Sequence, residues 1–313
     1  MPLAVIAIGG NSLITDAEHK TVEDQYEAAA ETGHHITALI AEGWDVAVTH
    51  GNGPQVGFIL RRSELASHEL HEVPLDVCGA DTQGAIGYAL QQNLRNDFNR
   101  AGIDKSVVTV VTQVEVSRDD PAFANPSKPI GSFMDEAEGK RRRDEDGWDV
   151  MEDAGRGWRR VVASPQPTKV IELDIVKQLL AAGVVVITVG GGGIPVVSDD
   201  DGNLTGVPAV IDKDLASALL AQLIDADLLI ISTAVEKVAL NFGTPDERWM
   251  DEFTLAEVKQ YLDEGVHFTE GSMAPKMRAV VQFLESGGRQ ALITNPENIA
   301  RAMARETGTW INA

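Results

Sequence analysis

Short apolar runs alternate along the chain with longer segments in which apolar residues recur every three or four positions. Residues 184–189 read VVVITV, an almost continuously apolar run that is typical of a strand buried on both faces. Residues 22–42 instead carry their apolar side chains at helical spacing. Strands that alternate with helices in this way predict an α/β fold with a parallel-rich sheet covered by helices.

The same pattern can be followed along the whole chain. We expect strands at 3–8, 45–49, 106–112, 184–189, 227–233 and 290–294. We expect helices at 22–42, 55–66, 84–99, 168–181, 213–223, 255–262 and 275–285. No internal repeat of the length used by solenoid proteins is present, so the elements predict one layered α/β architecture.

Residues 118–167 interrupt this alternation. They are rich in Pro, Gly, Asp and Arg and show no strong period. A structureless loop of this length is uncommon inside a compact domain, and such segments often act as lids. We therefore expect a small subdomain at 118–167 that projects over the rest of the molecule. It would belong to an N-terminal lobe, 1–207, followed by a C-terminal lobe, 208–313.

Composition narrows the setting. The chain has 313 residues, 43% of them hydrophobic, and no apolar run is long enough to span a membrane. No basic and apolar leader opens the sequence. The single cysteine, Cys78, excludes an internal disulfide, which fits a reducing cytoplasm. We expect its thiol to be packed rather than nucleophilic, because no activating pair is evident around it.

The chain is strongly acidic, with 48 acidic against 26 basic residues and a net charge of −22. This balance argues against a nucleic-acid partner, because phosphate backbones are bound by basic surfaces. Only ten of the basic residues are lysine. The acidity is typical of a well-solvated surface, and equally of adaptation to high internal salt. The sequence leaves both interpretations open.

Three glycine-rich turns directly follow predicted strands: Gly9-Gly10-Asn11, Gly51-Asn52-Gly53 and Gly190–Gly193. Glycine lets backbone N–H groups converge without interference from Cβ atoms, so such turns can hold a phosphate or another anion. Loops need glycine in any case, but a threefold recurrence favours a phosphorylated ligand. The Walker A and Rossmann fingerprints and the protein-kinase HRD and DFG motifs are all absent.

Phosphoryl transfer depends mainly on positioning and positive charge, and lysine supplies that charge at a point. Lys128, Lys213 and Lys276 stand among small or apolar residues in this lysine-poor chain. The alternative for each is an ordinary solvated lysine. That alternative is weakest for Lys213, because it opens a predicted helix whose positive end itself favours an anion. Asp212 and Asp214 flank Lys213, and either could cap the helix or orient lysines.

These motifs together resemble carbamate kinase, a branch of the amino-acid kinase family, nearly from end to end. They include Ala7–Asn11, Thr49–Gly57, Asp120–Phe123, Asn125–Gly131, Arg160–Val162, Gly190–Val196, Ala209–Ser217, Asn241–Gly243 and Gly271–Lys276. The segment Asn125–Gly131 separates this branch from its sister kinases. Those sisters usually have a lysine in the first strand, where this chain has Ala7 and Ile8.

The resemblance implies an open, mainly parallel eight-stranded αβα sandwich, usually a homodimer. It also implies a reversible, magnesium-dependent reaction in which ATP and carbamate give ADP and carbamoyl phosphate. In many cells the family runs towards ATP and ends arginine fermentation. Magnesium would be held by phosphate oxygens and water, with no protein metal ligands expected.

The resemblance also assigns roles by position. A cradle for the transferring phosphoryl group and carbamate would be formed by Gly9, Gly10, Asn11, Gly51, Asn52 and Gly53. Lys213 and Lys276 would neutralise phosphoryl oxygens, Asp214 would organise these lysines, and Lys128 would close over the acceptor side. Phe242 and Met273 would lie near the adenine. Two other interpretations remain: a kinase of the same fold for another small acid, and a non-catalytic ligand-binding regulator.

Overall fold

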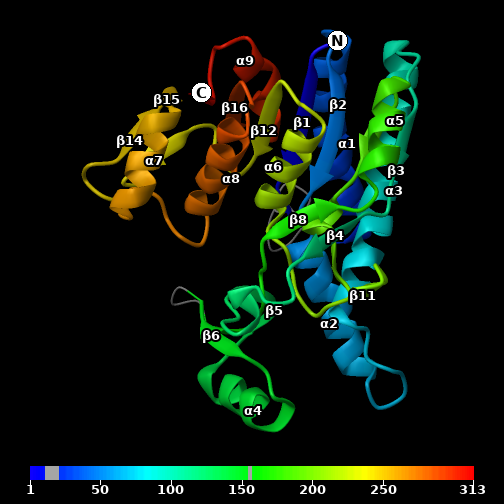
Figure 1. The fold of residues 1–313 in the computed structure, drawn as a ribbon, viewed down its shortest axis with the longest axis vertical. Coiled ribbons are helices and arrows are strands. Elements are labelled where there is room, and N and C mark those ends of the chain that lie inside the picture. The colour runs from blue at the N-terminus through cyan, green and yellow to red at the C-terminus, as the bar shows by residue number, and fades with distance from the viewer. Residues whose placement is uncertain (11–20, 154–156) are drawn as a thin grey trace.

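The main sheet contains eight strands and runs through the centre of the molecule (Figure 1). The computed structural model describes residues 1–10, 21–153 and 157–313. Across the sheet the order is β15 (Glu252–Thr254), β17 (Thr309–Asn312), β16 (Gln290–Thr294), β12 (Leu228–Ser232), β1 (Leu3–Ile8), β2 (Asp45–His50), β9 (Val185–Ile187) and β3 (Val107–Thr109). Only the pair β16–β17 is antiparallel among them. The expected eight-stranded, mainly parallel sheet is therefore confirmed.

Helices cover both faces of this sheet, and the alternation of side chains along β1 explains how. Val5 and Ala7 belong to a core shared with α6 (Lys213–Leu223) and α8 (Met273–Glu285). Ile6 and Ile8 point the other way, into a core shared with α1 (Val22–Ala41) and α3 (Leu75–Ala101). Because successive strand residues face opposite sides, an apolar strand of this kind must be buried between two helical layers.

The topology brings the glycine turns together. β1, β2 and β9 are consecutive neighbours and mutually parallel, so their carboxyl ends lie at one edge of the sheet. Gly9 follows β1, Gly51 follows β2, and Gly190 comes soon after β9. Ligands of open α/β sheets bind outside the carboxyl ends of the strands. This edge is therefore where a site is expected.

Three sequence predictions need correction. The helix expected at 168–181 begins only at Leu173 as α5 (Leu173–Ala181), because Val170 and its neighbours pair as β8 (Pro167–Val170) with β4 (Gln113–Val116). The strand expected at 106–112 ends at Thr109. Helix α3 begins at Leu75 rather than at 84, and the part that was missed contains Gly79, which weakens a helical pattern. β4 and β8 form a second sheet with β10 (Ile194–Ser198) and β11 (Leu204–Gly206).

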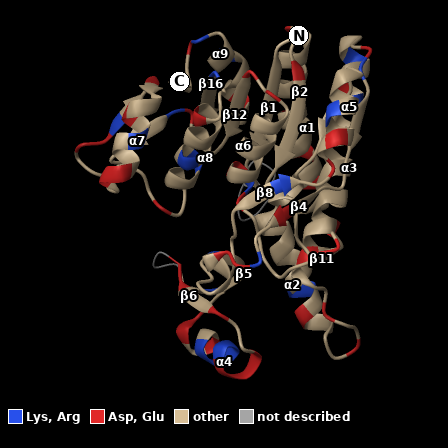
Figure 2. Cartoon of the chain, in the orientation of Figure 1, with Lys and Arg blue, Asp and Glu red and all other residues tan. Residues whose placement is uncertain are grey.

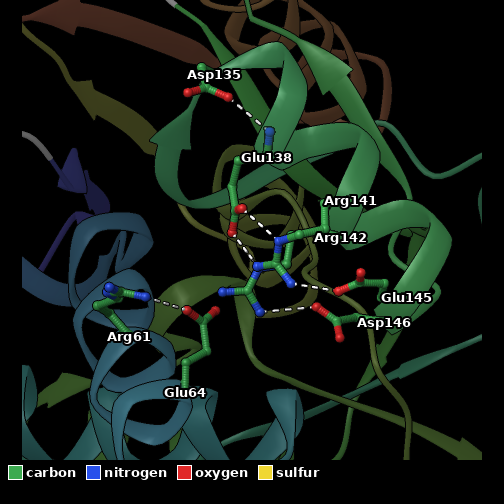
Figure 3. Close-up of polar contacts among 8 residues, drawn as sticks. All are labelled: Arg61, Glu64, Asp135, Glu138, Arg141, Arg142, Glu145 and Asp146. Carbon is green, nitrogen blue, oxygen red and sulfur yellow. Dashed lines mark hydrogen bonds and ion pairs between the residues drawn. The ribbon is translucent and has the colours of Figure 1, made fainter.

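The elements between positions 128 and 162 lie apart from the main sheet (Figure 1), and we call the described part of 118–167 the projecting subdomain. It has an antiparallel sheet, ordered β5 (Lys128–Met134), β7 (Trp158–Val162) and β6 (Val150–Glu152), and one helix, α4 (Glu136–Asp146). Helix α4 carries no apolar period because charged side chains pair along it (Figure 3). Arg141 pairs with Glu138 and Glu145, and Arg142 pairs with Glu138 and Asp146. Pairs this exposed contribute little stability each.

The remaining described elements lie around these sheets. They are α2 (Gly53–Ala66), α7 (Leu255–Glu264), α9 (Ile299–Met303), the short helical turns Pro121–Phe123, Gly190–Gly192 and Pro296–Asn298, and the hairpin of β13 (Val238–Leu240) and β14 (Arg248–Met250). Within the described ranges, no helix is long and apolar enough to cross a membrane.

Candidate active site

A cavity of about 250 Å³ opens at the carboxyl edge of the sheet, between the glycine turns and the projecting subdomain. Its lining gathers residues from seven separate parts of the chain. Those predicted from sequence are Gly9, Gly10, Gly51, Asn52, Gly53, Lys128, Lys213 and Lys276. Asn11 lies outside the described residues, and Asp214 is buried beneath the cavity. The structure therefore brings the predicted glycines and lysines to one place.

Asp214 joins two of the lysines. Its Oδ1 accepts a hydrogen bond from Nζ of Lys213 at 2.8 Å, and its Oδ2 accepts one from Nζ of Lys276 at 2.9 Å. Lys213 also donates to the carbonyl of Ala7 at 3.3 Å. Lys213 is the first residue of α6 and Lys276 lies in the first turn of α8. Two helix N-termini therefore present their lysines to a single carboxylate.

Burial and the neighbouring charges shift the pKa values of all three groups. Burial alone would raise the pKa of Asp214, but the two lysines hold it well below its usual range. Burial lowers the pKa of Lys213, and Asp214 opposes that effect while the nearby Lys276 adds to it. Burial would also lower the pKa of Lys276, but Asp214 outweighs it and raises that pKa. One buried carboxylate thus holds two partly buried lysines by opposite charge.

Lys128 enters the cavity from the projecting subdomain. It is the first residue of β5, and its Nζ donates to Oδ2 of Asp212 at 2.8 Å. Asp212 is also the N-cap of α6, where its Oδ1 accepts from the backbone N–H groups of Asp214 and Leu215 at 2.9 and 3.4 Å. Sequence reasoning considered Asp212 as a cap or lysine partner. It had no signal that the partner would be Lys128, 84 positions away.

The glycine turns are packed directly on one another. A Cβ added at Gly51 would lie 2.7 Å from the backbone nitrogen of Gly10 and 3.0 Å from its Cα. Beside them, Asn52 Nδ2 donates to Oγ1 of Thr82 at 2.8 Å. The close approach of the first two turns therefore requires glycine at position 51.

Gln83 is a residue that sequence reasoning missed. Its Nε2 donates to the carbonyls of Thr112 and Gly190 at 3.0 and 2.9 Å, and its Oε1 accepts from the N–H of Thr112 at 2.7 Å. Gln83 is buried on α3. Through its bond to Gly190 it holds the third glycine turn in place. No local sequence pattern marks a glutamine for this role.

His50 was also not selected, although it ends β2 directly before the second turn. It is 1% exposed, and its Nδ1–H donates to the carbonyl of Gly51 at 3.1 Å. Burial lowers the pKa of His50 to about 4, with the bond to Gly51 opposing and the charge of Lys213 assisting. The imidazole is therefore neutral at pH 7, and it supports the turn without adding charge.

A second, smaller cavity of about 90 Å³ contains both residues that were predicted near the adenine, Phe242 and Met273. Trp249 lines it too, with its ring edge-on to Phe242 at a centroid distance of 6.1 Å. The two cavities are linked by the chain, because Ala234 lines the first and Val235 the second. The lining of the small cavity is mainly apolar and aromatic, and Lys237, His267, Thr269 and Ser272 also border it.

Two other features bear on the chemistry of the chain: its possible metal ligands and its single cysteine. Among the described residues, no cluster of three His, Cys, Asp or Glu side chains is placed to hold a metal ion. Cys78 is fully buried, and burial with nearby Asp81 raises the pKa of its thiol to about 11. A thiol with so high a pKa is a poor nucleophile, in agreement with its expected role as a packed side chain.

Comparison with known proteins identifies the family to which this fold belongs. A model of the amino acid kinase family matches residues 2–295. The chain therefore belongs to the amino acid kinase family, and it is a kinase, an enzyme that transfers phosphoryl groups. Within the family the expected resemblance to carbamate kinase is confirmed. A carbamate kinase from Pyrococcus horikoshii is 46% identical over 310 residues, which make up 98% of each chain.

Two other relatives extend this result. A carbamate kinase-like protein from Escherichia coli is 49% identical over 312 residues, covering 99% of this chain and 98% of the relative. The solved structure of a carbamate kinase from Giardia lamblia bound to AMP-PNP is 39% identical, with a TM-score of 0.91. That comparison covers 99% of this chain and 98% of the other. The similarity thus includes the projecting subdomain as well as the sheet.

Proposed function

We propose that this protein is a carbamate kinase that transfers a phosphoryl group reversibly between ATP and carbamate. The observation that carries the proposal is the pair Lys213 and Lys276, held by Asp214 beside the glycine turns. It occurs in a chain that is 46% identical to carbamate kinases over nearly its whole length. Phosphoryl transfer requires this combination of fixed positive charge and backbone donors rather than covalent chemistry.

In the reaction towards carbamoyl phosphate, the bond between the γ-phosphorus and the oxygen bridging to ADP breaks. A carbamate oxygen forms the new bond to phosphorus. Lys213 and Lys276 stabilise the charge on the transferring group, and Asp214 keeps both ammonium groups in place. Backbone N–H groups of the turns, at Gly9, Gly10 and Gly51–Gly53, hold the phosphoryl group and carbamate. The cavity of about 250 Å³ favours a small acceptor.

Lys128 is assigned to the acceptor side, since it comes from the subdomain opposite the turns. The base of ATP or ADP is assigned to the aromatic cavity with Phe242 and Met273. Magnesium would enter with the nucleotide and reduce the charge of its phosphates. The two carboxylates near the cavity, Asp212 and Asp214, are already bonded to lysines. The metal would therefore be held mainly by phosphate oxygens and water.

Several broader assignments belong to the same proposal. The lobe 1–207, with the subdomain 118–167, would carry the acceptor, and the lobe 208–313 would carry the nucleotide. The enzyme would act as a homodimer in the cytoplasm, without nucleic acid. In arginine fermentation it would run towards ATP. The similarity to carbamate kinases supports these assignments.

The competing function is a kinase of the same fold for another small acid, and product identification separates the two. We would incubate the protein with MgATP and ammonium bicarbonate, which contains carbamate, and follow phosphorus by NMR. The proposal predicts a carbamoyl phosphate resonance that grows together with ADP. The control reactions replace bicarbonate with acetate or N-acetylglutamate. ADP formation with either control acid, and none with carbamate, would refute the proposal.

A further inference from the structure

The contact between Lys128 and Asp212 is the ion pair that ties the projecting subdomain to the catalytic cavity. Nζ of Lys128 lies 2.8 Å from Oδ2 of Asp212, and the pair is partly buried, with 34% and 16% of the two side chains exposed. Lys128 begins β5 in the subdomain, whereas Asp212 is the N-cap of α6 in the main body. A single bond therefore fixes a lysine of one part against a helix of the other.

The two carboxylate oxygens of Asp212 accept hydrogen bonds from different groups. Oδ1 caps α6 through the N–H groups of Asp214 and Leu215, and Oδ2 binds Lys128. The cap orients the carboxylate, so the direction of Oδ2 is set by the helix that also carries Lys213. Because Asp212 caps the helix that carries Lys213, it fixes Lys128 in position relative to the lysine pair around Asp214.

The geometry leaves Lys128 able to act on a ligand at the same time. An ammonium group has three N–H donors. Within the described residues, the bond to Asp212 is the one hydrogen bond that Nζ of Lys128 makes. The other donors can face the cavity that Lys128 lines. Asp212 therefore orients Lys128 and leaves the other N–H donors of its ammonium group available to a ligand.

We infer that Asp212 is a positioning residue for phosphoryl transfer, which acts by holding Lys128 in the catalytic cavity. The inference rests on the proposed function and deepens it. It makes a distinctive kinetic prediction. Removing the negative charge of Asp212 leaves the cavity more positive, so an anionic substrate binds at least as well. Lys128 is then misplaced for the transfer step, so turnover falls.

The test is Asp212→Asn. Asparagine caps a helix about as well as aspartate, so α6 keeps its cap while the charge that binds Lys128 is lost. We expect kcat to fall about tenfold or more, because a charge-assisted hydrogen bond positions the lysine. The KM for carbamoyl phosphate stays unchanged or decreases. The matched control is Asp135→Asn, the same change at the N-cap of α4, whose side chain accepts from the N–H of Glu138 at 2.8 Å.

A second readout does not depend on activity. Amide hydrogen exchange of Ser127, Lys128, Ile130 and Gly131 is compared in the wild type, Asp212→Asn, Lys128→Met and the double variant. If the pair acts as a unit, each single variant raises the exchange rate several-fold, and the double variant adds nothing further. Asp135→Asn leaves these amides unchanged.

The outcomes separate this inference from the proposed function. An unchanged kcat in Asp212→Asn overturns the inference, and so does a fall in kcat matched by a rise in KM. Exchange in the double variant that exceeds both single variants also overturns it. If the wild type transfers no phosphoryl group from carbamoyl phosphate, the proposed function fails. The exchange experiment then decides alone whether Asp212 holds Lys128.

Discussion

At the scale of single residues, the site depends on one buried carboxylate shared by two lysines. Burying an isolated charge is strongly unfavourable, and only partners with good geometry offset the loss of hydration. Asp214 has a lysine on each oxygen, at 2.8 and 2.9 Å. This arrangement keeps two ammonium groups close together although they repel each other. Neither lysine could occupy its place without Asp214.

The first prediction concerns these lysines. Lys213→Met and Lys276→Met should each reduce kcat about a hundredfold or more, because each removes a fixed charge that faces developing negative charge. Each variant should still fold, since the other lysine continues to neutralise Asp214. Steady-state kinetics and circular dichroism measure the two effects. Lys259→Met is the control, because Lys259 lies on the surface of α7 and pairs with Glu285. Near-normal turnover in Lys213→Met or Lys276→Met would exclude the assigned roles.

The second prediction concerns His50 and pH. Its pKa is about 4 in the folded protein and about 6.5 when exposed. The unfolded chain therefore binds a proton at a higher pH than the folded one. The stabilising effect is fully present above pH 6.5 and is lost as the pH falls towards 4. It amounts to a few kcal/mol, on the order of 3.

Chemical denaturation between pH 4 and 7 measures this effect. His50→Asn should show a flatter dependence of the free energy of unfolding on pH than the wild type. The exposed His68, replaced in the same way, should keep the wild-type slope. Equal slopes for His50→Asn and the wild type would show that His50 does not titrate as its burial requires.

At the scale of elements, three parallel strands deliver three glycine turns to one edge of the sheet. The third prediction tests their packing. Gly51→Ala would place a Cβ 2.7 Å from the backbone nitrogen of Gly10, so one of the two turns must move. Activity should fall by roughly a hundredfold, as expected for a displaced binding group. The control is Gly84→Ala on α3, where an added Cβ meets nothing within 4 Å. Full activity in Gly51→Ala would contradict the close packing.

The sequence predicted best the elements whose apolar pattern is continuous. Residues 22–42 and 213–223 form helices within one residue of the expected bounds, because their apolar stripes are continuous. Short strands at 150–152 and 167–170 were missed, because three or four residues cannot establish a period. Their structure is set by pairing with strands far along the chain, which sequence patterns do not encode.

The site was also predicted only in part: its glycines and lysines were found, but the contacts among its residues were not. Glycines after strands and lysines in apolar surroundings are visible locally. The three predicted lysines line one cavity together with glycines from each turn, namely Gly9, Gly10, Gly51, Gly53 and Gly191. Contacts between distant segments are not visible locally. Lys276 meets Asp214 across 62 positions and Gln83 meets Gly190 across 107. The topology of the sheet creates these contacts, so only the folded chain reveals them.

At the scale of the whole molecule, the net charge of −22 is spread widely. Figure 2 shows Asp and Glu on helices and loops throughout the structure rather than in one patch. In 0.01 M salt the Debye length is ~30 Å, so these charges repel one another across the molecule. In 1 M salt it falls to ~3 Å and most of that repulsion is removed.

The fourth prediction follows from this screening. The melting temperature and the activity should rise between dilute buffer and molar potassium chloride. Salt also screens the lysines that attract phosphates, so substrate affinity can fall while stability increases. Melting curves and Michaelis constants must therefore be measured separately. A flat or falling melting temperature would mean that the acidity only keeps the surface solvated, and the high-salt interpretation would be abandoned.

The central claim is that the cavity transfers a phosphoryl group between carbamate and a nucleotide. Its most direct test is the formation of ATP from ADP and carbamoyl phosphate in the presence of magnesium, coupled to a luminescent readout. Acetyl phosphate and other acyl phosphates are assayed beside it at equal concentration. The account predicts rapid ATP formation with carbamoyl phosphate, much slower formation with the others, and loss of the signal in Lys276→Met. Equal or faster formation with another acyl phosphate, or a signal that survives in Lys276→Met, would contradict it.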